Sequence, residues 1–139
     1  FPYTTLFRSG LLSVKDILEL PSLKSKLIVL SACQTGRGQI TGDGVIGLSR
    51  AFIIAGTPSI LVSQWNVDDV MTEYQMGLLY DEMIKQSDKN KARSLRNAQL
   101  KTIQFMEKGL TSRDADESAK KLRANPRYWA AFQLIGEYR

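Results

Sequence analysis

The hydrophobic positions along the chain follow two spacings, one typical of strands and one typical of helices. Short apolar runs bounded by charged or turn residues predict three buried strands, at residues 27–31, 59–64 and 130–135. Helical spacing and helix-forming composition predict four helices, at residues 14–20, 45–55, 69–86 and 91–108. Because the strands alternate with helices long enough to cross a sheet, we expect an α/β fold whose sheet is mostly parallel and flanked by helices.

Capping residues and glycines refine the ends of these helices. Ser13 is suited to cap the first helix, with Asp16 near its positive end. Gly56 and Gly109 are suited to end the second and fourth helices, and either Asp68 or Asp69 caps the third. Residues 111–122 are polar and helix-compatible and predict an exposed extension, and Asn125-Pro126 predicts a turn before the last strand.

The first nine residues do not share this patterning. FPYTTLFRS lacks hydrophobic periodicity and resembles the conceptual translation of a common short-read sequencing adapter. We therefore expect residues 1–9 to be an artefact and residues 10–139 to be the authentic domain. On this interpretation the natural protein extends upstream, and the N-terminal strands missing from a three-stranded sheet lie there.

Composition and charge exclude several classes of protein. The apolar runs are too short to cross a membrane, and a lone cysteine fits a reducing, cytoplasmic setting without disulfides. The net charge of +5 is compatible with nucleic-acid binding, but the basic residues alternate with acids on predicted helices. We interpret them as solvated helix faces and expect no nucleic-acid partner.

The lone cysteine, Cys33, is the candidate for chemistry. It follows the predicted strand 27–31, at the edge where α/β folds place their ligands, and its own backbone N–H could face an oxyanion. A thiol needs a base to become a nucleophile, and the chain contains no histidine. From the residues alone two interpretations stay open, a catalytic thiol and a small buried side chain.

Several motifs together resemble one known family. They are Ser31-Ala-Cys-x-Thr-Gly36, Gly42-Asp-Gly44 opening a helix, Ser63-x-Trp65, Asp68-Asp69, and Tyr128-Trp-Ala-Ala-Phe132. The combination is similar to the CHAT domain, a family of bacterial caspase-like proteins often fused to tetratricopeptide repeats. The likeness runs from about Leu11 to Glu137 and implies the C-terminal part of a caspase-like, three-layer fold.

The resemblance implies a function as well as a fold. It matches Cys33 to the nucleophile of a cysteine endopeptidase that cleaves a protein substrate by a Cys–His dyad. The family's histidine ends the preceding strand, so we expect it upstream, together with a regulatory tetratricopeptide-type domain, and we expect the 139 residues alone to be inactive. The alternative is a CHAT-like fold without catalysis that serves as an interaction or scaffold module.

Four further residues are candidates for substrate binding. Asp43 lies between Gly42 and Gly44 and could cap the helix or face a substrate side chain. Trp65 follows a predicted strand and could line the substrate cleft or cover the rim of the core. Asp68 and Asp69 fit a helix cap and a first-turn acid, or acids that select a basic substrate side chain. The glycines after Cys33 form no nucleotide-binding motif, and no residue spacing fits a metal site, so we expect no cofactor.

Overall fold

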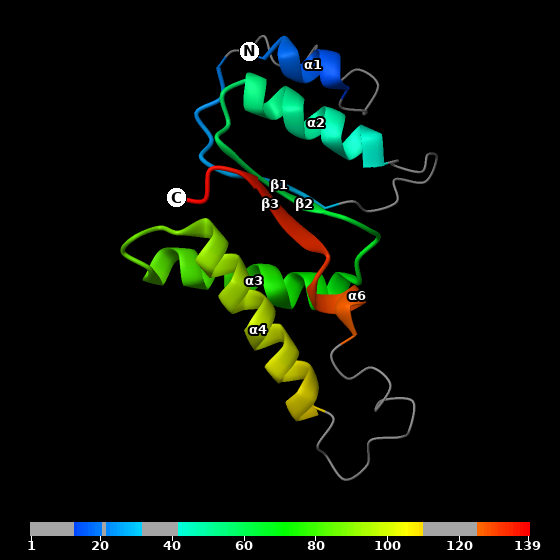
Figure 1. Ribbon diagram of the computed structural model, residues 1–139, viewed down its shortest axis with the longest axis vertical. Coiled ribbons are helices and arrows are strands. Elements are labelled where there is room, and N and C mark those ends of the chain that lie inside the picture. Colours follow the sequence, from blue (N-terminus) through cyan, green and yellow to red (C-terminus); the bar gives the residue numbers. More distant parts are fainter. Residues whose placement is uncertain (1–12, 21, 32–41, 110–124) are drawn as a thin grey trace.

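A three-stranded sheet separates two groups of helices (Figure 1). The computed structural model describes residues 13–20, 22–31, 42–109 and 125–139. Its elements, in chain order, are α1 (Val14–Leu18), β1 (Ile28–Leu30), α2 (Gly42–Ile54), β2 (Ser59–Ser63), α3 (Asp69–Lys85), α4 (Lys91–Gly109), α6 (Pro126–Trp129) and β3 (Phe132–Gly136). The α/β class predicted from the sequence is confirmed.

The sheet is mixed, with the order β1-β2-β3. β1 and β2 are parallel, with Val29 opposite Leu61, whereas β3 runs antiparallel to β2. The prediction of parallel strands is therefore right for β1 and β2 and wrong for β3. Between β1 and β2, the described part of the chain holds the helix α2, which carries the chain back across the sheet. After the helices α3, α4 and α6, β3 starts beside the end of β2, where Phe132 pairs with Ser63.

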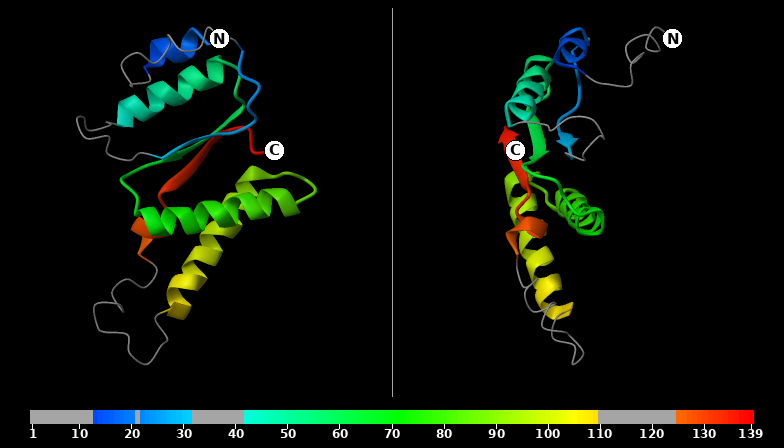
Figure 2. Two further views of the ribbon diagram at one scale, coloured as in Figure 1. Left: turned by 180° about the vertical axis from the view of Figure 1, so that it is seen from behind. Right: turned by 90° about the vertical axis from the view of Figure 1, so that its right-hand side faces the viewer.

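The two faces of the sheet carry two separate hydrophobic cores. Alternate strand residues point to opposite faces, so Ile60 and Val62 belong to one core and Leu61 to the other. The first core is completed by α1 and α2, with Ile17 and Phe52 buried. The second is completed by α3, α4 and the chain before β3, and its buried members are Leu61, Leu79, Leu95, Ala98, Ala131 and Phe132. Figure 2 shows the resulting three layers from two sides.

Local sequence explains how the first helix is fixed. The Ser13 side chain accepts a hydrogen bond from the Asp16 backbone N–H (3.3 Å), and the Asp16 carboxylate accepts from the Ser13 backbone N–H (2.8 Å) and hydroxyl (2.6 Å). These hydrogen bonds, the side-chain one first, lower the pKa of Asp16 below its usual value. The predicted cap is confirmed, although α1 ends two residues earlier than expected, at Leu18.

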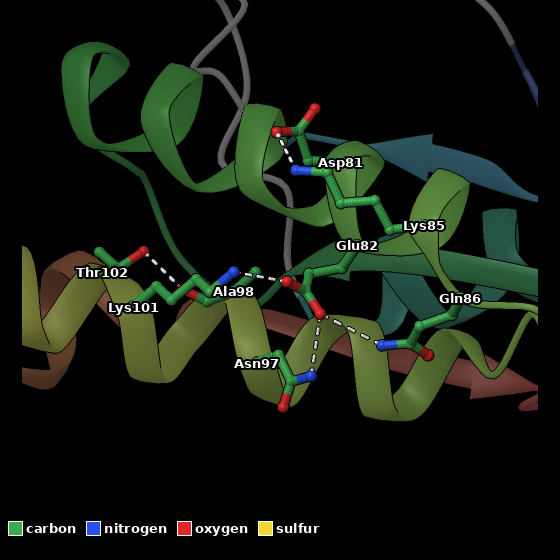
Figure 3. A network of polar contacts seen from close by, with 8 residues as sticks. All are labelled: Asp81, Glu82, Lys85, Gln86, Asn97, Ala98, Lys101 and Thr102. Atoms are coloured by element: carbon green, nitrogen blue, oxygen red, sulfur yellow. Dashed lines mark hydrogen bonds and ion pairs between the residues drawn. The ribbon is translucent and has the colours of Figure 1, made fainter.

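The helix pair α3–α4 is joined by a polar network around Glu82 (Figure 3). The Glu82 carboxylate accepts hydrogen bonds from the ammonium of Lys101 (2.5 Å), the amide of Asn97 (2.9 Å) and the amide of Gln86 (3.2 Å). These donors, Lys101 first, lower the pKa of Glu82 to about 2. In the same contact Glu82 raises the pKa of Lys101. The network holds α4 against α3 over the second core.

The segment before β3 departs from the sequence prediction. The sequence predicts a turn at Asn125-Pro126 and then a strand at 130–135. The structure places Tyr128 and Trp129 in the short helix α6, and β3 begins two residues later than predicted. Asn125 caps α6 by accepting from the Arg127 N–H (3.0 Å), and Pro126 stands in its first turn, where the missing N–H costs nothing. Phe132, the first residue of β3, is buried.

Some predictions lie outside the described residues. These are the artefact at 1–9, the exposed extension at 111–122 and the loop that contains Cys33. Among the helices that are described, none combines the length and the apolar character needed to cross a bilayer.

Candidate functional site

Several chain segments meet at the edge where the parallel strands β1 and β2 end. The chain leaves β2 at Ser63 and enters α3 at Asp69, and α6 leads into β3 at the same edge, where Phe132 pairs with Ser63. The N-terminal end of α2 also lies on this side (Figure 1). The carboxyl ends of parallel strands are where α/β folds place their binding sites. This edge is therefore the candidate site.

The side chains of two of the five predicted site residues lie outside the described part of the structure. Cys33 follows Leu30, the last residue of β1, by three positions and lies outside the described residues. Asp43 is the second residue of α2, which begins at Gly42, three positions before the predicted start. The side chain of Asp43 is likewise outside the described part. Their roles stay predictions.

Trp65 is held at the site by a hydrogen bond to a residue that is distant in the sequence. Its indole Nε1 donates to the backbone carbonyl of Arg127 in α6 at 3.0 Å. The ring remains 38% exposed, so it is neither a core residue nor a free surface side chain. Trp65 and Asn66 on one side, and Pro126 and Arg127 on the other, line an open pocket of about 400 Å³.

The helix α6 forms one wall of this pocket. Three backbone carbonyls in and after α6, at every second residue, accept hydrogen bonds that hold this wall in place. The carbonyl of Arg127 accepts from Trp65, that of Trp129 from the Gln75 side chain (2.7 Å), and that of Ala131 from the Gln64 N–H (2.7 Å). The three donors come from the end of β2 and from α3. The chain that leaves β2 thus positions α6 and the start of β3.

Gln75 is the buried member of this series. Its side chain is completely buried on the inner face of α3, and its amide nitrogen bridges α3 to α6. The carbonyl oxygen of the same amide, also buried, has no hydrogen-bond partner among the described residues. A buried amide that is only half satisfied is a costly feature, and this one lies next to the pocket wall.

Asp68 and Asp69 have different roles at the start of α3. The Asp68 carboxylate accepts from the backbone N–H of Met71 at 3.0 Å and is the N-cap of the helix. Asp69 lies exposed in the first turn. The predicted cap and first-turn acid are confirmed, and substrate selection by either acid stays a prediction. Elsewhere in the described residues, no group of three or more possible metal ligands is gathered.

Sequence reasoning missed Gln64, Gln75 and the Arg127 backbone. The polar residue Gln75 falls on the inward face of a predicted helix that is otherwise apolar, next to Leu78 and Leu79, and this position is the one signal available from the sequence. The local sequence contains no signal for Arg127, because it contributes a backbone carbonyl to the site and not its side chain.

Comparison with known proteins identifies this domain. The chain belongs to the CHAT domain family, whose model matches residues 3–137. That match includes residues 3–9, so the origin of the segment 1–9 stays a prediction.

Two curated proteins are similar to the chain. Tetratricopeptide repeat protein 28 of Mus musculus is 31% identical over 129 residues, and that of Homo sapiens is 32% identical over 126 residues. These alignments cover 93% and 91% of the chain but 4% of each relative, so the chain spans a small part of their length. No solved structure matches the chain.

Proposed function

We propose that the chain is the nucleophile-bearing part of a cysteine endopeptidase that cleaves protein substrates. The observation that carries the proposal is membership of the CHAT family, which is caspase-like, together with a single cysteine that follows β1 by three residues. Because three residues of backbone span at most about 11 Å, the proposal assigns this cysteine to the edge where β1 and β2 end.

The chemistry proceeds through a thioester. The Cys33 thiolate attacks the scissile carbonyl carbon, and the backbone N–H of Cys33 stabilises the resulting oxyanion. The tetrahedral intermediate expels the amine, which takes a proton from a general acid, and leaves an acyl-enzyme. Water, deprotonated by the same group, then hydrolyses the thioester and restores the thiol.

The acid and base in these steps is a histidine supplied from outside the 139 residues, because this sequence contains none. A positioned imidazole is suited to both roles, since its pKa lies close to neutrality. On this proposal the 139-residue chain folds but does not turn over substrate.

The pocket beside Trp65 is the proposed contact surface for the substrate. Its indole, held at Nε1 by Arg127, presents a fixed apolar wall that an extended peptide can contact. Asp43, Asp68 and Asp69 are further proposed contacts for a basic substrate side chain. Of the last two, Asp69 is the better candidate, because the Asp68 carboxylate is engaged as the cap of α3.

A helical-repeat regulatory partner and a cytoplasmic location belong to the same proposal. The partner is supported by the printed name of both relatives, which are tetratricopeptide repeat proteins. A lone cysteine without a disulfide partner agrees with a reducing compartment.

The second candidate function is a non-catalytic interaction module with the same fold. The absence of histidine from these 139 residues favours it, because the dyad is not contained in the sequence. The two functions make opposite predictions for a longer polypeptide that carries an upstream strand ending in histidine.

Peptide hydrolysis by matched polypeptides tests the proposal. We expect a fluorogenic substrate library to be cleaved by the longer polypeptide, not by the 139-residue chain, and not by the longer Cys33→Ala variant. Cleavage by the 139-residue chain that depends on Cys33 would refute the need for histidine. A folded longer polypeptide without Cys33-dependent cleavage of any substrate, whether or not its upstream strand ends in histidine, would refute the peptidase and leave the interaction module.

A further inference from the structure

The outward face of α3 carries apolar side chains where a surface helix normally carries polar ones. Val70 is 73% exposed and Ile84 is 83% exposed, and Tyr80 between them is also exposed. The buried residues of the helix, Gln75 and Leu79, lie on its opposite face. Figure 2 (right) shows α3 nearly end-on, beside α4, with no other described element against its outer side.

Three residues of this outward face form a nearly straight line along the helix. Val70, Gly77 and Ile84 follow one another at intervals of seven residues, a spacing that returns to nearly the same side of a helix after two turns. At 1.5 Å per residue the line is about 21 Å long. We call Val70, Gly77, Tyr80 and Ile84 the α3 seam. Its length and heptad spacing match what a second helix requires of a packing surface.

Gly77 in the middle of the seam has no explanation within the part of the chain that the structure describes. A β-carbon added there meets no atom within 4 Å, and the residue has no left-handed backbone that would require glycine. Glycine inside a helix is unfavourable when nothing calls for it. A glycine at the centre of an exposed apolar line leaves room for another backbone to approach closely, as small residues do at helix–helix contacts.

Acidic side chains outnumber basic ones beside the seam. Asp69 lies along one edge of it and Glu73 lies between Tyr80 and Ile84, and within the described residues neither carboxylate takes part in an ion pair or hydrogen bond. On the other edge Asp81 is already paired with Lys85 (3.2 Å). Unpaired acids along an apolar line favour a partner that carries lysine or arginine beside its own apolar residues, and disfavour an anionic lipid surface.

We propose that the α3 seam docks an amphipathic α-helix of the helical-repeat partner, with an apolar face opposite Val70, Gly77 and Ile84 and basic residues opposite Asp69 and Glu73. This identity of the partner rests on the proposed function, whereas docking itself does not involve Cys33. The docked helix lies on the reverse side of α3 from Gln75, which holds the pocket wall at Trp129. A partner bound there therefore contacts the one helix that joins the seam to the candidate site.

Binding of two synthetic peptides tests the surface. Each is a 24-residue helix with leucine at heptad spacing, and they differ in carrying lysine or glutamate beside the leucines. We expect fluorescence anisotropy with the 139-residue chain to show the lysine peptide binding at least tenfold more tightly than the glutamate peptide. Equal binding of the two would overturn the charge argument and with it the proposal.

Matched variants locate the binding. Ile84→Glu should weaken the lysine peptide at least tenfold, whereas Ile54→Glu, at a similarly exposed position on α2, should leave it unchanged. Gly77→Leu should keep or raise the melting temperature, because space is open there, and still weaken binding. Equal effects of Ile84→Glu and Ile54→Glu, or unchanged binding by Gly77→Leu, would place the peptide elsewhere.

Binding of something other than a partner helix to the α3 seam would give different experimental results. A concentration-dependent dimer in sedimentation that Ile84→Glu abolishes would replace the helical partner with a second copy of the chain. Binding to phosphatidylserine vesicles that Ile84→Glu abolishes would replace it with a membrane. Cys33→Ala should bind the lysine peptide like the unaltered chain, so failure of hydrolysis with retained binding removes the peptidase and leaves this surface.

Discussion

Trp65 and Arg127 are separated by 62 residues and are joined by one hydrogen bond of 3.0 Å, from the indole Nε1 to a backbone carbonyl. The bond links the chain that leaves β2 to the helix that precedes β3. It thereby fixes both walls of the pocket that Trp65, Asn66, Pro126 and Arg127 line. Because the acceptor is a backbone atom, the contact depends on where α6 lies and not on the side chain at position 127.

Trp65→Phe removes this bond and keeps an aromatic ring. We expect the free energy of unfolding in urea to fall by about 1 kcal/mol, the usual net value of one hydrogen bond. Tyr80→Phe, at an exposed tyrosine without a described hydrogen bond, is the control and should stay within about 0.5 kcal/mol of the unaltered chain. A loss of equal size in both variants would show that the indole bond does not hold α6.

Glu82 makes the stability of the α3–α4 pair depend on acid pH. Its pKa is lowered from 4.5 in the unfolded chain to about 2 in the fold, chiefly by the hydrogen bond from Lys101. A carboxyl whose folded pKa is lowered contributes stability above its unfolded pKa, and this contribution is lost as the pH falls from about 4.5 towards 2. Glu82→Gln should therefore be less stable at neutral pH and lose less on acidification.

Urea unfolding at several pH values between 7 and 2 measures this difference. Asp81→Asn is the control, because its pair with Lys85 is exposed on both sides. Parallel pH profiles for Glu82→Gln and the unaltered chain would contradict the assigned role of Glu82.

Two glycines should respond to alanine in opposite directions. Gly136 has a φ of +94°, and an added β-carbon would overlap the carbonyl oxygen of Pro58. Gly136→Ala should lower the free energy of unfolding by about 1–3 kcal/mol or more. Gly77→Ala fills open space inside a helix and should raise it by up to about 1 kcal/mol. Thermal unfolding compares the two directly, and a stabilised Gly136→Ala would mean that β3 does not pack as described.

The cap of α3 is testable by a conservative rescue. Asp68→Ala removes the acceptor for the Met71 N–H and should lower the free energy of unfolding by about 1 kcal/mol. Asp68→Asn keeps an acceptor and should recover most of that loss. If asparagine and alanine are equally destabilising in urea, the cap is not the role of this residue.

Hydrophobic spacing alone predicted the strands and the long helices to within a few residues. It failed where long-range pairing decides the outcome. The direction of β3 is defined by its long-range pairing with β2, and an apolar run such as 130–135 carries no signal of strand direction. The helix α6 was not predicted because Asn125-Pro126 is typical of a turn as well as of a helix start.

The candidate site was less accessible to sequence reasoning. Residues alone left Cys33 between a catalytic and a buried role, and the family resemblance, now confirmed, favoured catalysis. The contacts that shape the pocket were not foreseen. Gln75 and Trp65 bind backbone carbonyls 54 and 62 residues away, and a carbonyl carries no residue-type signature in a sequence.

The position of β1 in the sheet has a consequence for how a dyad can be assembled. Within the described residues β1 is an edge strand, so the backbone groups on its outer side can pair with one more strand. A residue at the end of such a neighbour stands about 4.8 Å, one strand spacing, from Leu30 at the end of β1. On the proposed function, the histidine reaches the site from such a neighbouring strand, so it need not belong to the same polypeptide as Cys33. We then expect a separate polypeptide that adds this strand to complement the 139-residue chain in trans.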